Sequence, residues 1–335
     1  MKNKTLIRSL VATAVALGLA ASASAQQLSG ERPATVSEIP GVVAAGAPWE
    51  LVWADFMTAD GLVGTPDGGV LFAQEQSDSI KKLDANNHEQ TFLEDMHGPG
   101  AVSMDSQGRV YAVQRTCTDP GRWHFQSCPL LTRVMIVAPE QVMLANSTSD
   151  GRSLGRLNDL IADGKGGAYF TTAGVYYVNP KGVVSTVATD KEIRSNGLML
   201  SRDGKTLYVT NVTNIQAWDV QADGTTKNPH LFGDIAGDTG ADGMAIDSQG
   251  RLYVTASTGV HVLGPDGKHL GLIPTPRVPI TLAFSGPEKK TLYVGQMGVV
   301  GPDGKPWATP QGVRNTAMTV YRIQMQAEGF KGRPK

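Results

Sequence analysis

The chain has 335 residues, with 30 basic and 31 acidic side chains and a formal net charge of −1. This balance gives no basic field of the kind that binds nucleic acid, so we expect no nucleic-acid partner. Thirty-nine glycines combined with only 18% charged residues indicate many short strands joined by tight turns.

Residues 1–25 have the pattern of a secretory signal peptide. Basic residues precede a short apolar run at 10–20, and Ala23-Ser24-Ala25 forms a small-residue cleavage site. The alternative is an uncleaved anchor helix, which the cleavage pattern disfavours. No later stretch approaches the roughly 18 apolar residues of a membrane span. We therefore expect cleavage after Ala25 and a periplasmic or secreted protein without a membrane span.

A turn-flanked strand with an aromatic residue at a fixed place recurs six times. The segments in chain order are 66–74, 106–114, 164–172, 202–210, 248–256 and 288–296, with the aromatics Phe72, Tyr111, Tyr169, Tyr208, Tyr253 and Tyr293. Successive aromatics are 39, 58, 39, 45 and 40 residues apart. Four of these gaps match one four-stranded propeller blade. The pattern predicts an all-β, six-bladed β-propeller over 51–325, whereas a β-sandwich needs no such repeat.

The segments outside the predicted repeats bear on how the ring closes. Residues 316–325 alternate and could form the last outer strand, whereas the N-terminal segment 26–50 could supply it instead. The sequence leaves both possibilities open. Residues 326–335 are expected to form a C-terminal tail.

The long gap between the second and third repeats contains both cysteines. Cys117 and Cys128 lie in an insertion loop at 116–133. In an oxidising compartment two such cysteines are expected to pair as a disulfide. A metal or redox pair is the alternative, but the ten-residue gap is not a C-x-x-C motif.

A polar residue opens the innermost strand of several predicted blades. The residues 11 or 12 places before the six aromatics are Asp60, Pro99, Asn158, Asn196, Asp242 and Thr281. By repeat symmetry they should lie at one end of the central channel. At any single place, an ordinary Asx turn is the competing explanation. Four Asp or Asn side chains around one axis predict an oxygen-only metal site formed by Asp60, Asn158, Asn196 and Asp242.

The expected occupant of this site is one divalent cation. Ca²⁺ comes first, with Mg²⁺ or Mn²⁺ as alternatives, because these ions prefer oxygen ligands. None of the six positions is His or Cys, which argues against zinc.

Three segments also carry a family resemblance. "RLNDLIADGKGGAYFTT", "SNGLMLSRDGKTLYVTN" and "DGMAIDSQGRLYVTA" resemble successive inner-blade motifs of the senescence-marker-protein/gluconolactonase/luciferin-regenerating-enzyme family, which includes regucalcin and the drug-responsive lactonases. The resemblance covers roughly residues 50–300. It implies a six-bladed propeller with one divalent cation and, in enzymatic members, hydrolysis of lactones.

The resemblance also implies residue roles. Asn196 and Asp242 would be metal ligands, and Asp242 would also be the catalytic base. Asn158 would be a ligand or a substrate contact, and Arg156 a substrate contact. The first motif of the family usually starts with Glu, where this chain has Asp60.

These observations predict an exported metal-dependent lactonase, in which the metal polarises the carbonyl and Asp242 activates water. His97 is a candidate substrate contact and proton shuttle at the channel mouth, or a plain loop histidine. We expect Glu75 and Gln114 to be surface or loop residues. The alternative function is a non-catalytic periplasmic propeller that binds a small ligand or a protein. A quinone-dependent sugar oxidoreductase on the same fold has no specific support in the sequence.

Overall fold

The computed structural model describes residues 31–55, 57–115, 131–298, 308–309, 312–313 and 317–332. The predicted signal peptide and both cysteines lie outside these residues, so cleavage after Ala25 and the Cys117–Cys128 disulfide remain predictions. Helix in the described part is limited to two short 3₁₀ turns, η1 (Glu75–Ser77) and η2 (Pro287–Lys289). No helix in this part of the chain has the length and hydrophobicity of a membrane span.

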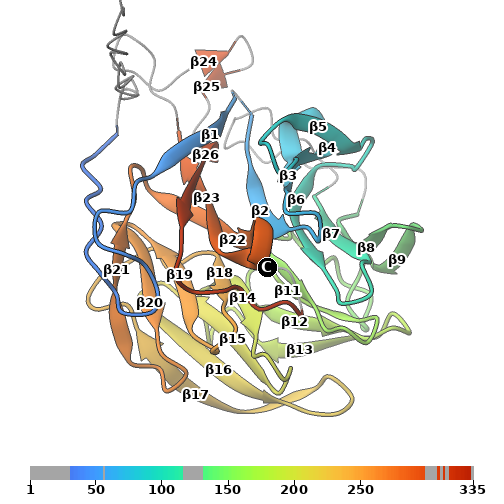
Figure 1. The fold of residues 1–335 in the computed structure, drawn as a ribbon. Coiled ribbons are helices and arrows are strands. Elements are labelled where there is room, and N and C mark those ends of the chain that lie inside the picture. The colour runs from blue at the N-terminus through green and yellow to red at the C-terminus, as the bar shows by residue number, and fades with distance from the viewer. Residues whose placement is uncertain are drawn as a thin grey trace, which may run out of the picture.

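Six four-stranded antiparallel sheets surround a central axis (Figure 1), so the predicted six-bladed β-propeller is confirmed. Blade 1 consists of β2 (Asp60–Gly64), β3 (Val70–Gln74), β4 (Ser79–Leu83) and β5 (Glu89–Leu93). Blade 2 consists of β6 (Pro99–Met104), β7 (Val110–Gln114), β8 (Arg133–Ala138) and β9 (Val142–Ala145). Blade 3 consists of β10 (Leu160–Ala162), β11 (Ala168–Thr171), β12 (Val175–Val178) and β13 (Val184–Ala188).

Blades 4 to 6 complete the ring. Blade 4 consists of β14 (Ser195–Leu200), β15 (Thr206–Asn211), β16 (Asn214–Val220) and β17 (Thr226–Asp234). Blade 5 consists of β18 (Met244–Ile246), β19 (Leu252–Ala256), β20 (Gly259–Leu263) and β21 (His269–Pro274). Blade 6 consists of β22 (Pro279–Ser285), β23 (Thr291–Met297), β26 (Ala317–Gln324) and β1 (Glu50–Ala54). A separate two-stranded ladder joins β24 (Ala308–Thr309) to β25 (Gly312–Val313).

The repeated aromatics lie on the second strand of every blade and form the core between blades. Their side chains are 0–8% exposed, and the ring of Tyr253 contacts that of Phe284 in the next blade at 4.9 Å. Alternation along these strands therefore buries one aromatic per blade. This explains why the aromatic period in the sequence reports the blade period.

The turn between the first two strands of blade 5 is closed by a buried carboxylate. Asp247 accepts hydrogen bonds from the Nε of Arg251 at 2.5 Å and the hydroxyl of Tyr253 at 3.0 Å. Blade 2 has the same arrangement with Asp105, Arg109 and Tyr111. The recurring "DSQGR" segment is therefore a structural clamp, because its charged groups bind one another within the turn.

The ring closes differently from either expectation. The segment predicted as the last outer strand supplies β26 in the third place, and of the segment 26–50 only Glu50 belongs to the outer strand β1 (Glu50–Ala54). Strand β26 is the third strand of blade 6, and β1 pairs with it as the outermost strand. Residues before β1 continue along blades 5 and 6, where Val36, Ile39, Val42 and Val43 join the buried core. The described part of the N-terminal segment, residues 31–49, is therefore part of the folded body.

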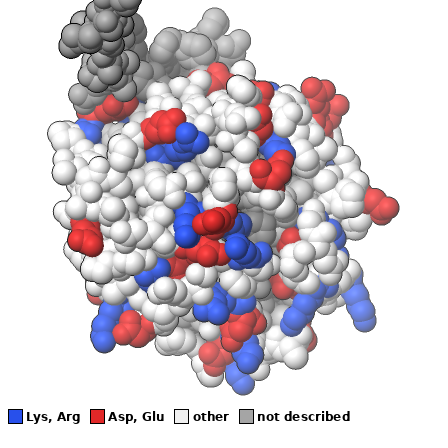
Figure 2. All heavy atoms as spheres, viewed as in Figure 1, with Lys and Arg blue, Asp and Glu red and all other residues white. Residues whose placement is uncertain are grey.

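Acidic and basic side chains are interspersed over the face of the molecule shown in Figure 2. Many of the exposed charges form local pairs within one turn, such as Lys268 with Asp266 at 3.0 Å. This face therefore has no single sign of charge.

Candidate active site

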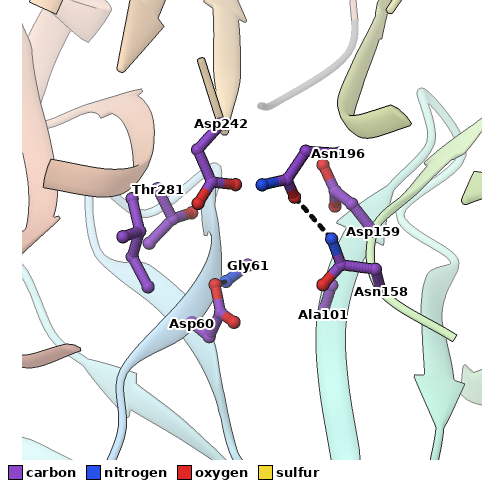
Figure 3. A pocket seen from close by; sticks show the side chains of 10 residues that line it. Asp60, Gly61, Ala101, Asn158, Asp159, Asn196, Asp242 and Thr281 are labelled. Carbon is purple, nitrogen blue, oxygen red and sulfur yellow. Dashed lines mark hydrogen bonds between the residues drawn. The ribbon is translucent and has the colours of Figure 1, made fainter. Parts of the chain in front are cut away.

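A cavity of about 100 Å³ lies where the innermost strands begin, at the centre of the ring. Every blade contributes to its lining, which consists of Asp60, Gly61, Ala101, Asn158, Asp159, Asn196, Asp242, Gly243, Ile280 and Thr281. The cavity thus contains all four residues predicted as metal ligands. Figure 3 shows their side chains directed toward a common space, with Asp242 and Asn196 facing each other and Asp60 opposite them.

Glycines next to the polar residues allow the inner strands to approach closely. A Cβ on Gly61 would lie 2.4 Å from the Cα of Ala101, and one on Gly197 would lie 2.2 Å from the carbonyl oxygen of Asp242. Gly243 is equally confined, since its Cβ would lie 2.7 Å from the carbonyl oxygen of Ile280. Close approach of neighbouring backbones requires glycine at such places. The Asp-Gly and Asn-Gly pairs in the sequence therefore build a narrow channel mouth.

Asp60 is a carboxylate in a poorly solvated place. Burial raises the pKa of Asp60, and the positive charge of Arg115 opposes this shift. Its Oδ1 accepts a hydrogen bond from the backbone N–H of Gly61 at 2.7 Å. The negative charges of Asp159 and Glu75 also raise its pKa. A cation in the cavity would therefore favour the ionised form of Asp60.

The two asparagines form a hydrogen-bonded amide pair. Asn158 Nδ2 donates to Asn196 Oδ1, as the dashed line in Figure 3 shows. Asn158 Oδ1 in turn accepts a hydrogen bond from Arg115 Nη2 at 3.2 Å. A carbonyl oxygen has two lone pairs, so Asn196 Oδ1 retains the capacity to bind a cation. Asn158 Oδ1 already faces a guanidinium cation, which makes it the less suitable metal ligand.

Asp159 lines the cavity but has a structural role as well. Its Oδ1 accepts from the backbone N–H of Leu160 at 2.8 Å, and its Oδ2 accepts from that of Leu198 at 3.4 Å. It therefore joins the inner strands of blades 3 and 4. Thr281 acts similarly between blades 6 and 1, because its hydroxyl accepts from the N–H of Leu62 at 2.9 Å.

A buried ion-pair network adjoins the cavity, and the sequence analysis missed it. Glu75 is only 4% exposed and contacts Arg115 Nη1 at 2.6 Å and Arg156 Nη2 at 3.1 Å. Gln114 is 3% exposed. The prediction that Glu75 and Gln114 are surface residues is therefore wrong. Glu75 does lie in the short turn η1 after β3, whereas Gln114 is the last residue of strand β7. Charged residues are rarely buried unless paired, and the two partners of Glu75 lie 40 and 81 residues away in the chain.

The remaining predicted site residues lie outside the cavity lining. Arg156 is half-buried beside Glu75, two residues before Asn158. His97 is exposed, in a left-handed turn (φ 51°) before β6. The structure therefore brings Arg156 near the site through the ion-pair network, whereas His97 is not among the residues that line the cavity.

The donor chemistry of the cavity fits a hard divalent cation. No cluster of three or more His, Cys, Asp and Glu side chains suited to a metal occurs among the described residues. Three carboxylates line the cavity, and the oxygens of Asp159 already accept backbone N–H groups. The donors suited to a cation are therefore the carboxylates of Asp60 and Asp242, together with the amide oxygens. Two carboxylates in one small cavity repel each other unless a cation lies between them. Oxygen-only donor sets of this kind suit Ca²⁺, Mg²⁺ or Mn²⁺.

Comparison with known proteins identifies the family. Residues 58–297 match the family described as SMP-30/Gluconolactonase/LRE-like region. The chain belongs to this family. A gluconolactonase from Zymomonas mobilis subsp. mobilis is 25% identical over 260 residues, which cover 69% of this chain and 68% of the relative. Lactonase drp35 from Staphylococcus saprophyticus is 28% identical over 240 residues, covering 66% and 70%. The resemblance noted in the sequence is thus confirmed.

Solved structures of the family share the fold. A gluconolactonase from Xanthomonas campestris aligns with a TM-score of 0.67 at 18% identity, covering 89% of this chain and 96% of that protein. Regucalcin from Agrobacterium tumefaciens, described as a calcium-binding protein, aligns with a TM-score of 0.62 at 18% identity, covering 84% and 95%. The SMP-30/gluconolactonase propeller is therefore conserved in this chain despite low sequence identity.

Proposed function

We propose that this protein is an exported, divalent-metal-dependent hydrolase that opens a lactone. Membership of the SMP-30/gluconolactonase family and the similarity to a gluconolactonase and a lactonase support the reaction class. The observation that carries the assignment is the convergence of Asp60, Asn158, Asn196 and Asp242 on one central cavity. The small-molecule lactone would enter this cavity from the channel.

We assign the cation to Asp60, Asn196 and Asp242, with Ca²⁺ as the first candidate and Mg²⁺ or Mn²⁺ as the others. A bound cation of this kind supplies Lewis acidity toward a carbonyl oxygen. Asn158 has its Oδ1 directed at Arg115 and its Nδ2 at Asn196, so we assign it to orienting the substrate. Arg156, half-buried at the edge of the ion-pair network, is the second substrate contact.

Asp242 is the proposed general base. It takes a proton from the attacking water, whose oxygen bonds to the lactone carbonyl carbon. The ring C–O bond then breaks and the former ring oxygen takes up a proton, so the product is a hydroxy acid. A positioned base of this kind contributes about 10²–10⁴ in rate.

The test is lactone turnover as a function of cation concentration. Asp242→Asn keeps a side-chain oxygen for the cation but removes the proton acceptor, so turnover should fall about 10²–10⁴-fold while cation binding remains measurable. Asn196→Ala removes a neutral ligand, and higher cation concentrations should partly restore its activity. Asp266→Asn, in an exposed turn, is the charge-matched control. Near-parent turnover of Asp242→Asn at saturating cation would remove Asp242 as the base.

A propeller that binds a ligand without hydrolysing it is the second candidate. It is favoured by Asp60, which replaces the longer Glu that usually begins the first motif of the family. If the parent hydrolyses no lactone in a broad panel with any of the three cations, this binding function replaces the enzymatic one. Export is tested separately by sequencing the N-terminus of the mature protein, which should begin at Gln26.

A further inference from the structure

The ion-pair network contains a guanidinium held on three sides. Arg115 is 9% exposed. Its Nε donates to the carbonyl oxygen of Leu157 at 2.8 Å, its Nη1 to Glu75 Oε2 at 2.6 Å, and its Nη2 to Asn158 Oδ1 at 3.2 Å. These three acceptors lie in different directions around one planar group. Only the fixed fork of an arginine can reach all of them at once.

The backbone of blade 2 leaves room for this guanidinium. A Cβ on Gly100 would lie 2.4 Å from Arg115 Nε and 2.5 Å from its Cζ. The guanidinium therefore lies directly against the first strand of blade 2, where any side chain larger than hydrogen would displace it. Glycine at this place has a packing reason, since its φ is not in the left-handed region.

A chain of hydrogen bonds that includes the Arg115 guanidinium connects four consecutive blades. Glu75 follows β3 in blade 1, and Arg115 follows β7 in blade 2. Arg115 binds Asn158 at the start of blade 3, and Asn158 binds Asn196 in blade 4. Each amide has one oxygen and one nitrogen, so fixing the Asn158 oxygen on Arg115 also directs its nitrogen to Asn196.

We propose that Arg115 is a positioning residue, which holds the Asn158 amide and, through it, the Asn196 oxygen in the orientation that the central cavity requires. Glu75 anchors Arg115 from blade 1, and Gly100 makes room for it. Arg115 does not touch the substrate in this scheme. Its effect on turnover rests on the proposed lactonase function, whereas its effect on the two amides does not.

A merely electrostatic role predicts different behaviour. Arg115→Lys keeps the positive charge but loses the three-way fork, so a role of charge alone predicts near-parent properties for this variant. Gly100→Ala keeps both charged residues and pushes the guanidinium away from the strand. A positioning role predicts that both variants disturb the orientation of the Asn158 amide, although only one of them changes Arg115 itself.

The experiment compares crystal structures and cation titrations of the parent, Arg115→Lys and Gly100→Ala. We expect the Asn158–Asn196 hydrogen bond to be lost or the Asn158 amide to be turned in both variants. Calorimetry with Ca²⁺ and Mn²⁺ should show a cation affinity at least about tenfold lower than that of the parent. The kcat/KM for a lactone should also fall about tenfold or more, since small misplacements near a reacting centre are costly. Arg251→Lys, which disturbs the buried pair with Asp247 in blade 5, is the matched control and should leave the amides and kcat/KM unchanged.

Each outcome decides the proposal. An Asn158 amide that keeps its orientation in both variants overturns it, whatever the activity. If Arg115→Lys does not fold, Glu75→Gln combined with Arg115→Met removes both members of the buried Glu75–Arg115 pair, so neither of the two is left facing a missing partner. Unchanged amides in this double variant overturn the proposal equally. A parent that binds cation but hydrolyses no lactone would end the proposed function, while the structural comparison would still decide the role of Arg115.

Discussion

At the residue scale, the site depends on small groups beside polar ones. Asp60, Asn196 and Asp242 are each followed by glycine, and the missing Cβ lets the neighbouring inner strand lie close. The polar side chains can then face one another across a cavity of only about 100 Å³. These residues were predictable because the repeat places each of them at the start of an inner strand. Glu75 and Arg115 were not, since a long-range ion pair leaves no periodic signal in a single sequence.

Asp60→Asn should raise the stability of the cation-free protein and weaken cation binding. Burial raises the pKa of Asp60 in the folded protein, so the folded state binds its proton more tightly than the unfolded state. Above its ordinary pKa, ionised Asp60 therefore disfavours folding when no cation is present. Asparagine keeps the oxygen that accepts from Gly61 but carries no charge. We expect a higher Tm in chelator at neutral pH, by about 2 °C or more, together with weaker cation binding.

The measurement is thermal unfolding in chelator and in excess cation. The parent should gain more in Tm from the cation than Asp60→Asn does, because a ligand stabilises the state that it binds. Asp266→Asn serves as the control in an exposed turn. An Asp60→Asn protein that melts lower than the parent in chelator, yet gains as much from cation, would contradict the prediction.

At the element scale, the segment that leads to Asp242 is fixed by a partly buried acid–histidine cluster. Asp238 Oδ2 accepts from the hydroxyl of Thr258 and lies 3.0 Å from His261 Nε2. His261 Nδ1 lies 2.9 Å from His269 Nε2 on the neighbouring strand β21. Asp238 is four residues before Asp242, so strands β20 and β21 hold the approach to the proposed base.

This cluster predicts sensitivity of the fold to acid. Burial lowers the pKa of His269, and the charge of His261 adds to this effect, while Asp234 opposes it. An unfolded chain would therefore bind the proton more readily than the folded one as the pH falls through about 6.5. The stability present at neutral pH should therefore decrease as the pH falls below this value. His269→Gln should flatten the decrease, because it removes the group that takes up the proton on unfolding.

Tm measured between pH 8 and pH 5 checks this prediction. The exposed His230 on β17 provides a matched control, and His230→Gln should follow the pH dependence of the parent. Equal slopes for the parent and His269→Gln would show that the histidine pair does not contribute. A similar flattening in His230→Gln would point to a general charge effect instead.

At the scale of the whole molecule, the ring is closed by both ends of the propeller. The repeat of aromatics predicted the number of blades, because one aromatic per blade fills the core between neighbours. It could not show how β1 and β26 share blade 6, since the aromatic repeat marks only the second strand of each blade and leaves the outer strands unassigned. That choice depends on pairing between residues far apart in the chain, such as Glu50 with Arg322.

The closing strand should be essential for stability. Trp53 on β1 is 7% exposed, lies 5.0 Å from the ring of Phe72 and donates from Nε1 to Glu89 at 2.6 Å. It therefore joins blade 6 to blade 1. We expect Trp53→Ala to lower the free energy of unfolding by about 3–5 kcal/mol, as measured by urea denaturation. Leu51→Ala, at an exposed position of the same strand, should change the free energy of unfolding far less. A small effect of Trp53→Ala would show that β1 is dispensable.

The pairing of β1 with β26 also sets the order in which the protein can assemble. The ion pair between Glu50 and Arg322 joins residues 272 positions apart, so β1 leaves the ribosome long before its partner exists. The entropic cost of joining distant segments grows only slowly with their separation, but long-range strand pairing slows folding. Five blades can form from strands that neighbour one another in the chain, whereas blade 6 must wait for residues 317–324. A nascent chain therefore carries two unpaired strand edges, on β1 and β23, until its synthesis has passed Gln324.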